Sequence, residues 1–415
     1  MRQMNENDYS DSRAEELLDR RGLTRRDLVK LGAALPVALG IARLATPIST
    51  ARAAAAENGS PIAKRLPPEW FVNFGTNAEM RWDSIGGVGY TTPNDRFFVR
   101  DHTATPIIDA ATWSLTIFGT GLKGSPVSFT YAQLQALSQK EIVSFIECAG
   151  NGRSFFGSQQ GTPAAGTQWG LGAIGVARWR GVPLSEILDR AGLTADALDV
   201  MPYGLDGNVV TGGIDYGKVR RPIPVAKALD NALVALEMNG QPLPADHGFP
   251  ARLIVPGWIG VANVKWIGQI EVSRQPLFSL WNTQQYVMTG PSYPTTPLLT
   301  TQVVKSAWEL ARGATFPTGT PQLLYGRAWS GEAGINRVDV SVDRGVTWTA
   351  AKLLNRSGPG NWSRFAYPLP NLPAGTYELW ARATDNHYRE QPSISTFNTA
   401  GYQFGAVVRH PITLR

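Results

Sequence analysis

Cys148 has the most specific chemistry in the sequence, because it is the only cysteine among 415 residues. It follows the apolar run Ile142–Ile146 and precedes Ala149-Gly150-Asn151-Gly152-Arg153, so we expect a buried strand that ends in a tight turn. A thiolate at a strand end, close to backbone N–H groups freed by glycines and to an arginine, suits a soft metal ion. The alternative is a small buried apolar side chain, which describes most single cysteines.

The supply of metal-binding side chains excludes several kinds of site. One cysteine allows no intrachain disulfide, cysteine zinc cluster, iron–sulfur cluster or haem attached through CxxCH. The four histidines leave little room for a multi-histidine site, and no G-x-G-x-x-G follows a strand to open a helix. We therefore predict no haem, flavin or iron–sulfur cluster in this chain. The histidines are His102, His247, His387 and His410.

The composition is that of a globular protein with small partners. Hydrophobic residues make up 43% and charged residues 17%, which provides a sizeable core and excludes a disordered or fibrous chain. The net charge of +6 is not gathered into a Lys/Arg block or a basic stripe with interleaved aromatic residues. We predict no nucleic-acid partner, and the charge is compatible with a small anionic substrate.

Residues 1–56 are predicted to be a twin-arginine signal peptide. The sequence Thr24-Arg25-Arg26-Asp27-Leu28-Val29-Lys30 precedes an apolar run over 31–45, and Ala51-Arg52-Ala53 is typical of a cleavage site. The alternative is a short membrane-anchoring helix, but the run is shorter than the ~20 residues needed to span a bilayer. We expect export to the periplasm or cell exterior, with no membrane span after the signal is removed.

The chain after the signal divides by pattern into two domains. Residues 67–280 mix short strands with a few short helices and predict an α+β domain. A connection rich in Gln, Thr, Tyr and Pro occupies 275–295. Residues 295–415 show alternating strands, such as Val338–Asp343 and Glu378–Thr384, separated by turn signals, and predict an immunoglobulin-like β-sandwich.

The sequence around Cys148 resembles the molybdenum-ligand motif of the sulfite oxidase family of molybdopterin enzymes. Other segments are similar to that family in the same order along the chain, and the likeness covers residues 67–412. They are Asn94–His102, Gly172–Trp179, which leads into a helix, Glu237–Arg252, Val255–Gly257, Asn263–Trp266, and the sandwich segments Gly326–Gly331 and Val338–Trp348.

The resemblance implies a molybdenum–molybdopterin cofactor with Cys148 as the metal ligand. It implies that Arg100 and Arg153 face the substrate, where planar guanidinium donors suit an oxyanion. Cys148, Arg100 and Arg153 would be the catalytic residues. The predicted cofactor-binding residues are Phe98, Arg100, Asp101, His102, Cys148, Asp206, His247, Arg252, Asn263, Val264 and Lys265.

The resemblance also implies a reaction: oxidation of sulfite, or a related sulfur oxyanion, to sulfate by oxygen-atom transfer at molybdenum. Electrons would pass to an external acceptor such as a c-type cytochrome, and the sandwich domain would form a homodimer. Two alternatives remain: a sulfane dehydrogenase subunit acting on carrier-bound sulfur, and a sulfoxide reductase.

The sequence departs from the family pattern around the substrate. The segment Asn398-Thr399-Ala400-Gly401 stands where an arginine is common, so one cation is missing. The family's pocket tyrosine is assigned to either Tyr216 or the place of Val219. Asp101 stands where asparagine is usual.

Overall fold

The computed structural model describes residues 60–415. The predicted signal peptide, residues 1–56, lies outside these residues. Across 60–415, no helix combines the length and the hydropathy that crossing a bilayer requires.

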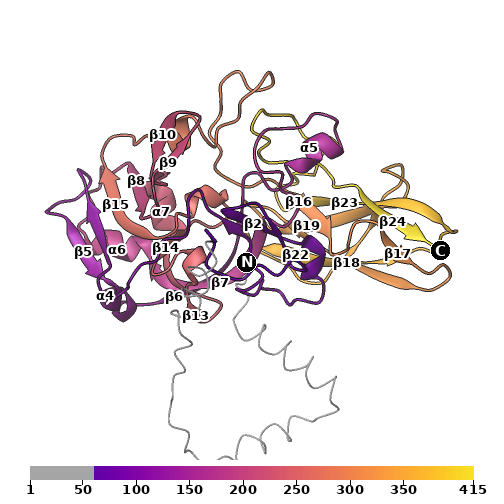
Figure 1. The fold of residues 1–415 in the computed structure, drawn as a ribbon, viewed down its shortest axis with the longest axis horizontal. Helices are drawn as coiled ribbons and strands as arrows, with labels where there is room; N and C mark the ends of the chain where they lie inside the picture. The colour runs from indigo at the N-terminus through magenta and orange to yellow at the C-terminus, as the bar shows by residue number, and fades with distance from the viewer. Residues whose placement is uncertain (1–59) are drawn as a thin grey trace, which may run out of the picture. The chain divides into compact units, whose positions relative to one another are not determined.

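The first domain is built on three sheets and a hairpin (Figure 1). A small antiparallel sheet holds β1 (Phe71–Asn73), β2 (Asn77–Met80) and β3 (Val99–Arg100). The second sheet has the order β11 (Ile223–Pro224), β8 (Asp199–Gly204), β15 (Ile267–Ser273), β4 (Ser114–Phe118) and β5 (Val127–Thr130). The third has the order β13 (Gln241–Pro242), β12 (Leu233–Met238), β7 (Ile174–Pro183) and β6 (Lys140–Glu147), with β14 (Arg252–Ile254) also paired to β12. The hairpin joins β9 (Val209–Thr211) to β10 (Ile214–Gly217).

The helices of this domain are short. They are α4 (Tyr131–Ala136), α5 (Ser154–Ser158), α6 (Leu184–Arg190), α7 (Val225–Asn231) and α8 (Leu280–Thr283), with 3₁₀ turns η1 (Trp82–Ile85), η2 (Ala245–His247) and η3 (Gly260–Ala262). Helix α4 begins with a capping box, in which the Thr130 hydroxyl accepts from the Gln133 N–H and the Gln133 side chain accepts from the Thr130 N–H.

The C-terminal domain is a β-sandwich, drawn in orange to yellow in Figure 1. One sheet has the order β16 (Lys305–Trp308), β18 (Gln322–Trp329), β22 (Trp362–Leu369) and β21 (Lys352–Leu353). The other has the order β17 (Ala314–Phe316), β24 (His410–Leu414), β23 (Gly375–Asp385), β19 (Ile335–Ser341) and β20 (Thr349–Ala350). Alternate residues such as Val338, Val340, Leu379 and Ala381 are fully or almost fully buried between the sheets.

The predicted fold class, an α+β domain followed by a β-sandwich, is confirmed. The buried strand expected before Cys148 is β6, and the alternating segments of the sandwich are β19 and β23. The connection at 275–295, in which the sequence analysis placed no helix or strand, contains α8. This helix is one short turn, and its sequence offers no apolar periodicity long enough to reveal it.

Two glycines allow the two domains to meet backbone to backbone. A Cβ placed on Gly257, which has φ of +78°, would lie 2.0 Å from the Gly331 carbonyl oxygen. The Gly257 carbonyl accepts from the Gln302 N–H at 3.0 Å, and the Gly331 N–H donates to the Gln302 carbonyl at 3.1 Å. Only glycine has room at this contact, and Gly257 lies in the turn that follows β14.

Candidate active site

Cys148 lies in a tight turn immediately after β6. Its N–H donates to the Ala173 carbonyl at 2.9 Å, and its carbonyl accepts from the Asn151 N–H at 2.9 Å. The Asn151 side chain closes the turn by accepting from the Ala173 N–H at 3.1 Å. The Cys148 side chain is buried and reaches two adjoining pockets, both of which it helps to line.

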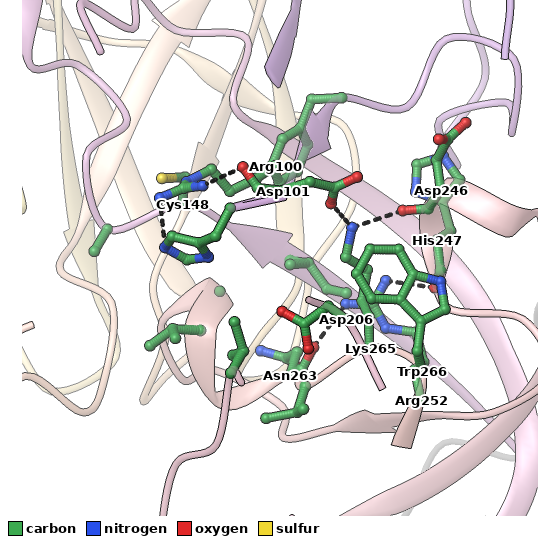
Figure 2. Close-up of a pocket in the computed structure, with 18 of the residues that line it drawn as sticks. Arg100, Asp101, Cys148, Asp206, Asp246, His247, Arg252, Asn263, Lys265 and Trp266 are labelled. Atoms are coloured by element: carbon green, nitrogen blue, oxygen red, sulfur yellow. Dashed lines mark hydrogen bonds and ion pairs between the residues drawn. The ribbon is translucent and has the colours of Figure 1, made fainter. Parts of the chain in front are cut away.

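The first pocket brings together all of the predicted cofactor-binding residues (Figure 2). Cys148 and Arg100 lie at one end, and Asp246 and His247 lie at the other. The lining includes Phe98, Arg100, Asp101, His102, Cys148, Asp206, His247, Arg252, Asn263, Val264 and Lys265. Arg153 is the one predicted site residue outside this set, and it lines the second pocket instead.

Arg100 and His102 form a fixed pair beside the Cys148 thiol. The Arg100 guanidinium donates to His102 Nε2 at 2.7 Å and to the Asp101 carbonyl at 2.7 Å. Burial and the Arg100 charge hold the pKa of His102 well below its usual range. Because a guanidinium only donates, His102 Nε2 is the acceptor and the proton of the neutral ring lies on Nδ1. Burial opposes the charge of Arg100, yet Tyr286, Cys148 and Tyr402 raise its pKa above the usual range.

At the other end of the pocket, Lys265 lies between the Asp101 carboxylate and the Asp246 backbone carbonyl. Its ammonium forms an ion pair with Asp101 and donates to the Asp246 carbonyl at 2.7 Å. The Asp246 carboxylate accepts from the Ala63 and Lys64 N–H groups at 2.7 and 2.8 Å. Lys265 is therefore partnered in this structure, and Asp101 supplies the countercharge where the family usually has a neutral asparagine.

Three buried polar atoms of this pocket have no hydrogen-bond partner among the described residues: Asp206 Oδ1, His247 Nε2 and Arg252 Nε. The other Arg252 nitrogens donate to the His247 and Asn263 carbonyls, both at 2.9 Å. Burial, together with Lys64 and Arg252, keeps the His247 ring neutral by holding its pKa well below the usual range. Unsatisfied polar atoms are costly in a protein interior, so their convergence on one cavity fits a polar ligand such as a pterin.

The second pocket contains Arg153, which the resemblance predicted to face the substrate. Arg153 donates from Nε to the Ala400 carbonyl and from Nη1 to the Thr167 carbonyl, both at 2.8 Å. Its guanidinium carbon lies 5.5 Å from the centre of the Tyr402 ring. Arg100 lines the same pocket, so two guanidinium groups and the Cys148 sulfur border one cavity of about 540 Å³.

The structure adds residues to this cavity that the sequence analysis missed, mainly from the connection at 275–295. Tyr286 is one, and its hydroxyl lies 3.3 Å from His102 Nε2. Of the two positions considered for a pocket tyrosine, Tyr216 lines the second pocket, whereas Val219 lines the first. The available signal for these residues in the sequence was a cluster of aromatic and amide side chains in the segment between the two domains. The added residues are Trp281, Gln285, Tyr286 and Tyr402.

A buried network of hydrogen bonds also holds the Cys148 turn through the preceding residue, Glu147. The Glu147 carboxylate accepts from Lys305 Nζ at 2.8 Å, Asn151 Nδ2 at 2.9 Å and Trp329 Nε1 at 3.0 Å. Lys305 Nζ also donates to the Asn151 carbonyl at 3.1 Å. Lys305 and Trp329 belong to the sandwich domain, so that domain fixes the residue next to the predicted metal ligand.

Two families match this sequence: the Oxidoreductase molybdopterin binding domain over residues 102–281 and the Mo-co oxidoreductase dimerisation domain over residues 315–413. Sulfite oxidase of Gallus gallus is 36% identical over 324 residues, which are 73% of this chain and 68% of that protein. The chain belongs to the sulfite oxidase family of molybdopterin oxidoreductases.

Other relatives cover different shares of their own length. Mitochondrial sulfite oxidase of Homo sapiens is 36% identical over 323 residues, and the chain spans 57% of that protein. The structure of the sulfane dehydrogenase SoxCD from Paracoccus pantotrophus superposes with a TM-score of 0.70 and 26% identity, covering 91% of this chain and 92% of that one. The molybdopterin family match and the unsatisfied atoms of the first pocket together indicate a molybdenum cofactor there.

We predict that Lys305→Met lowers the free energy of unfolding by about 3–5 kcal/mol, because it leaves the buried Glu147 carboxylate without its counter-ion. Adding Glu147→Gln should restore much of that loss. Urea unfolding of Lys305→Met and of the double variant measures the difference in the free energy of unfolding. Arg190→Met is the matched control: it breaks the exposed Glu186–Arg190 pair and should cost well under about 1 kcal/mol. Equal losses for both single variants would contradict the prediction.

A second prediction concerns pH. Burial raises the pKa of Asp206 from 3.8 to about 6, against opposing effects of backbone N–H groups and Lys218. The unfolded chain releases this proton near pH 4 while the folded chain keeps it, so stability falls as pH rises from about 4 to 6. In cofactor-free protein, Asp206→Asn should be more stable than wild type by up to about 3 kcal/mol at pH 7, and the difference should shrink towards pH 4. Urea unfolding across this range is the measurement, and a pH-independent difference would argue against it.

Proposed function

We propose that this protein oxidises sulfite, or a related sulfur oxyanion, to sulfate and passes the electrons to an external one-electron acceptor such as a c-type cytochrome. The observation that carries the proposal is the convergence of Arg100, Arg153 and Cys148 on one cavity. Two guanidinium groups attract a small oxyanion and offer it planar sets of donors.

The chain's own residues would have distinct roles in this reaction. A bound molybdenum cofactor would supply the oxygen-atom transfer and accept two electrons. Cys148 would ligate the metal, while the neutral His102 and His247 rings and Arg252 would hold the pterin. Arg100 and Arg153 would orient the anion and stabilise negative charge that develops on its oxygens. The Tyr286 hydroxyl lines the same cavity, and it would turn its proton from the accepting His102 Nε2 to the substrate.

A sulfane dehydrogenase, which would act on sulfur attached to a carrier, is the second candidate. The likeness to the Paracoccus pantotrophus sulfane dehydrogenase structure over nearly the whole chain favours it. The wide second pocket and Ala400, where the family commonly has an arginine, are also compatible with a substrate larger than sulfite. A cytochrome that copurifies obligately would distinguish this candidate from an enzyme that oxidises free sulfite.

We also propose that the protein is a homodimer formed through the sandwich domain, and that it is exported. The match of residues 315–413 to a dimerisation domain supports the first proposal. The twin-arginine pattern at Arg25 and Arg26 supports the second.

Sulfite-dependent reduction of ferricyanide and of cytochrome c tests the proposed reaction directly, with protein already shown to contain molybdenum. Cys148→Ser should lower turnover by at least about 100-fold, because a hydroxyl is a poor substitute for a thiolate on a soft metal. Molybdenum is measured in both proteins so that lost metal and lost chemistry are separated. Absence of sulfite turnover in the molybdenum-loaded wild type would overturn the proposal for free sulfite.

Export is tested by replacing both arginines, Arg25→Lys and Arg26→Lys, in a host that has the twin-arginine route. We expect the precursor to remain in the cytoplasm, whereas the unaltered chain is processed and found outside the inner membrane. Cell fractionation followed by mass measurement of the product detects both outcomes. Unchanged export of the double variant would refute this assignment of the signal.

A further inference from the structure

The second pocket is much larger than a sulfite ion and has an aromatic wall. Its volume of about 540 Å³ is many times that of the small ion it is proposed to take. Trp281, Tyr286 and Tyr402 form one continuous surface, with ring centres 6.4 Å apart for the first two and 5.3 Å apart for the last two. Trp169, Val209 and Tyr216 extend the apolar lining. Such a surface stabilises an organic group more than a bare oxyanion.

The positive charge available to a substrate in this pocket is limited. Arg100 and Arg153 are the cationic side chains among its lining residues. Arg221 lies behind Tyr286, but it is fully buried and donates to the Trp281 and Leu299 carbonyls, so it does not reach the cavity. Ala400 contributes only a methyl group, and its carbonyl is taken by Arg153.

Tyr402, which is polar but uncharged, lies beside Arg153. Its ring is stacked on Tyr286 with an interplanar angle of 14°. Burial is the main cause that raises the pKa of both phenols, so both hydroxyls stay protonated. Each has one proton, which a bound anion would draw away from its present acceptor, Gln285 Oε1 for Tyr402 and His102 Nε2 for Tyr286. The Gln285 side chain connects Tyr402 to Tyr216. It accepts a hydrogen bond from the Tyr402 hydroxyl at 3.4 Å and donates one to the Tyr216 hydroxyl at 3.2 Å.

We propose that the enzyme prefers organic sulfinates, R–SO₂⁻, and that Ala400 and Tyr402 set this preference. A sulfinate carries one negative charge shared by two oxygens, which matches two guanidinium groups and neutral phenol donors. Its organic substituent takes the place of the third oxygen of sulfite and packs against the aromatic wall. The inference rests on the proposed function, because it uses the same cofactor and the same oxygen transfer.

The reaction balances as R–SO₂⁻ + H₂O → R–SO₃⁻ + 2H⁺ + 2e⁻. One S–O bond forms, two O–H bonds of water break, and the sulfur is oxidised by two electrons. Two equivalents of a one-electron acceptor, ferricyanide in the test, take these electrons. The sulfur of a sulfinate keeps the lone pair that makes sulfite a substrate for oxygen transfer, so the class of chemistry is unchanged.

The test compares benzenesulfinate, methanesulfinate and sulfite as substrates of molybdenum-loaded wild-type protein, with ferricyanide as acceptor. We expect kcat/KM for benzenesulfinate to exceed that for sulfite by about ten-fold, as stacking and burial of one ring would give, with methanesulfinate between them. In water labelled with ¹⁸O, the benzenesulfonate formed should gain one labelled oxygen. Mass spectrometry of the product gives a readout independent of the acceptor.

Two variants test the residues named. Ala400→Arg adds a third cation to the pocket and should lower the ratio of sulfinate to sulfite kcat/KM by about ten-fold. Tyr402→Phe keeps the stacked ring and removes the hydroxyl, so KM for the sulfinate should rise about five- to ten-fold with kcat little changed. Tyr388→Phe is the matched control, because Tyr388 lies on the sandwich with 81% of its surface exposed. It should leave both constants unchanged.

The outcomes separate this inference from the proposed function. Sulfite turnover without oxidation of either sulfinate, and without competition by benzenesulfinate, overturns the inference and leaves the proposed function standing. No turnover of any of the three by molybdenum-loaded protein overturns both. Sulfinate oxidation with a ratio unaffected by Ala400→Arg overturns the assignment to Ala400. If that variant does not fold, the wild-type ratio and Tyr402→Phe decide the question.

Discussion

The site depends on a buried carboxylate that never reaches the substrate. Glu147 is fully buried at the end of β6, where its charge is tolerated only because Lys305, Asn151 and Trp329 surround it. Because Cys148 is the next residue, the same contacts fix the direction in which the thiol leaves the strand. Two of these partners come from the C-terminal domain, so the sandwich takes part in building the active site as well as carrying the dimerisation sequence.

The two pockets that Cys148 lines differ in how the charges of their cationic side chains are balanced. In the first, the cations are partnered by the protein itself, Lys265 with Asp101 and Arg252 with backbone carbonyls, and the histidine rings are neutral. Such a pocket recognises its ligand by directed hydrogen bonds. The second pocket has aromatic walls and no carboxylate among its lining residues, so no acidic side chain there neutralises Arg100 and Arg153, although both donate to backbone carbonyls.

Much of the first pocket could be predicted from the sequence because its residues come in short contiguous segments. Phe98–His102, Glu237–Arg252 and Asn263–Lys265 each keep their order in the fold, and the structure brings them together around one cavity. The second pocket was only partly predictable, since Tyr286, Tyr402 and Gln285 lie in segments with no regular periodicity. Nothing in local sequence shows that residue 286 stacks on residue 402, because that contact depends on how the two domains meet.

The sequence by itself determined the family, the order of the two domains and the identity of the lone thiol, because these depend on residue types and on spacing within short segments. The tertiary structure alone decided which charges are neutralised and which face the cavity. In the sequence, Asp101 is an acidic residue at a position where the family usually has asparagine. In the fold it is the ion-pair partner of Lys265. Arg153 and Arg221 are the same residue type and both donate to backbone carbonyls, but Arg153 lines the second pocket whereas Arg221 is fully buried away from it. Pairing and burial are properties of distances between segments far apart in the chain, and those distances exist only once the chain has folded.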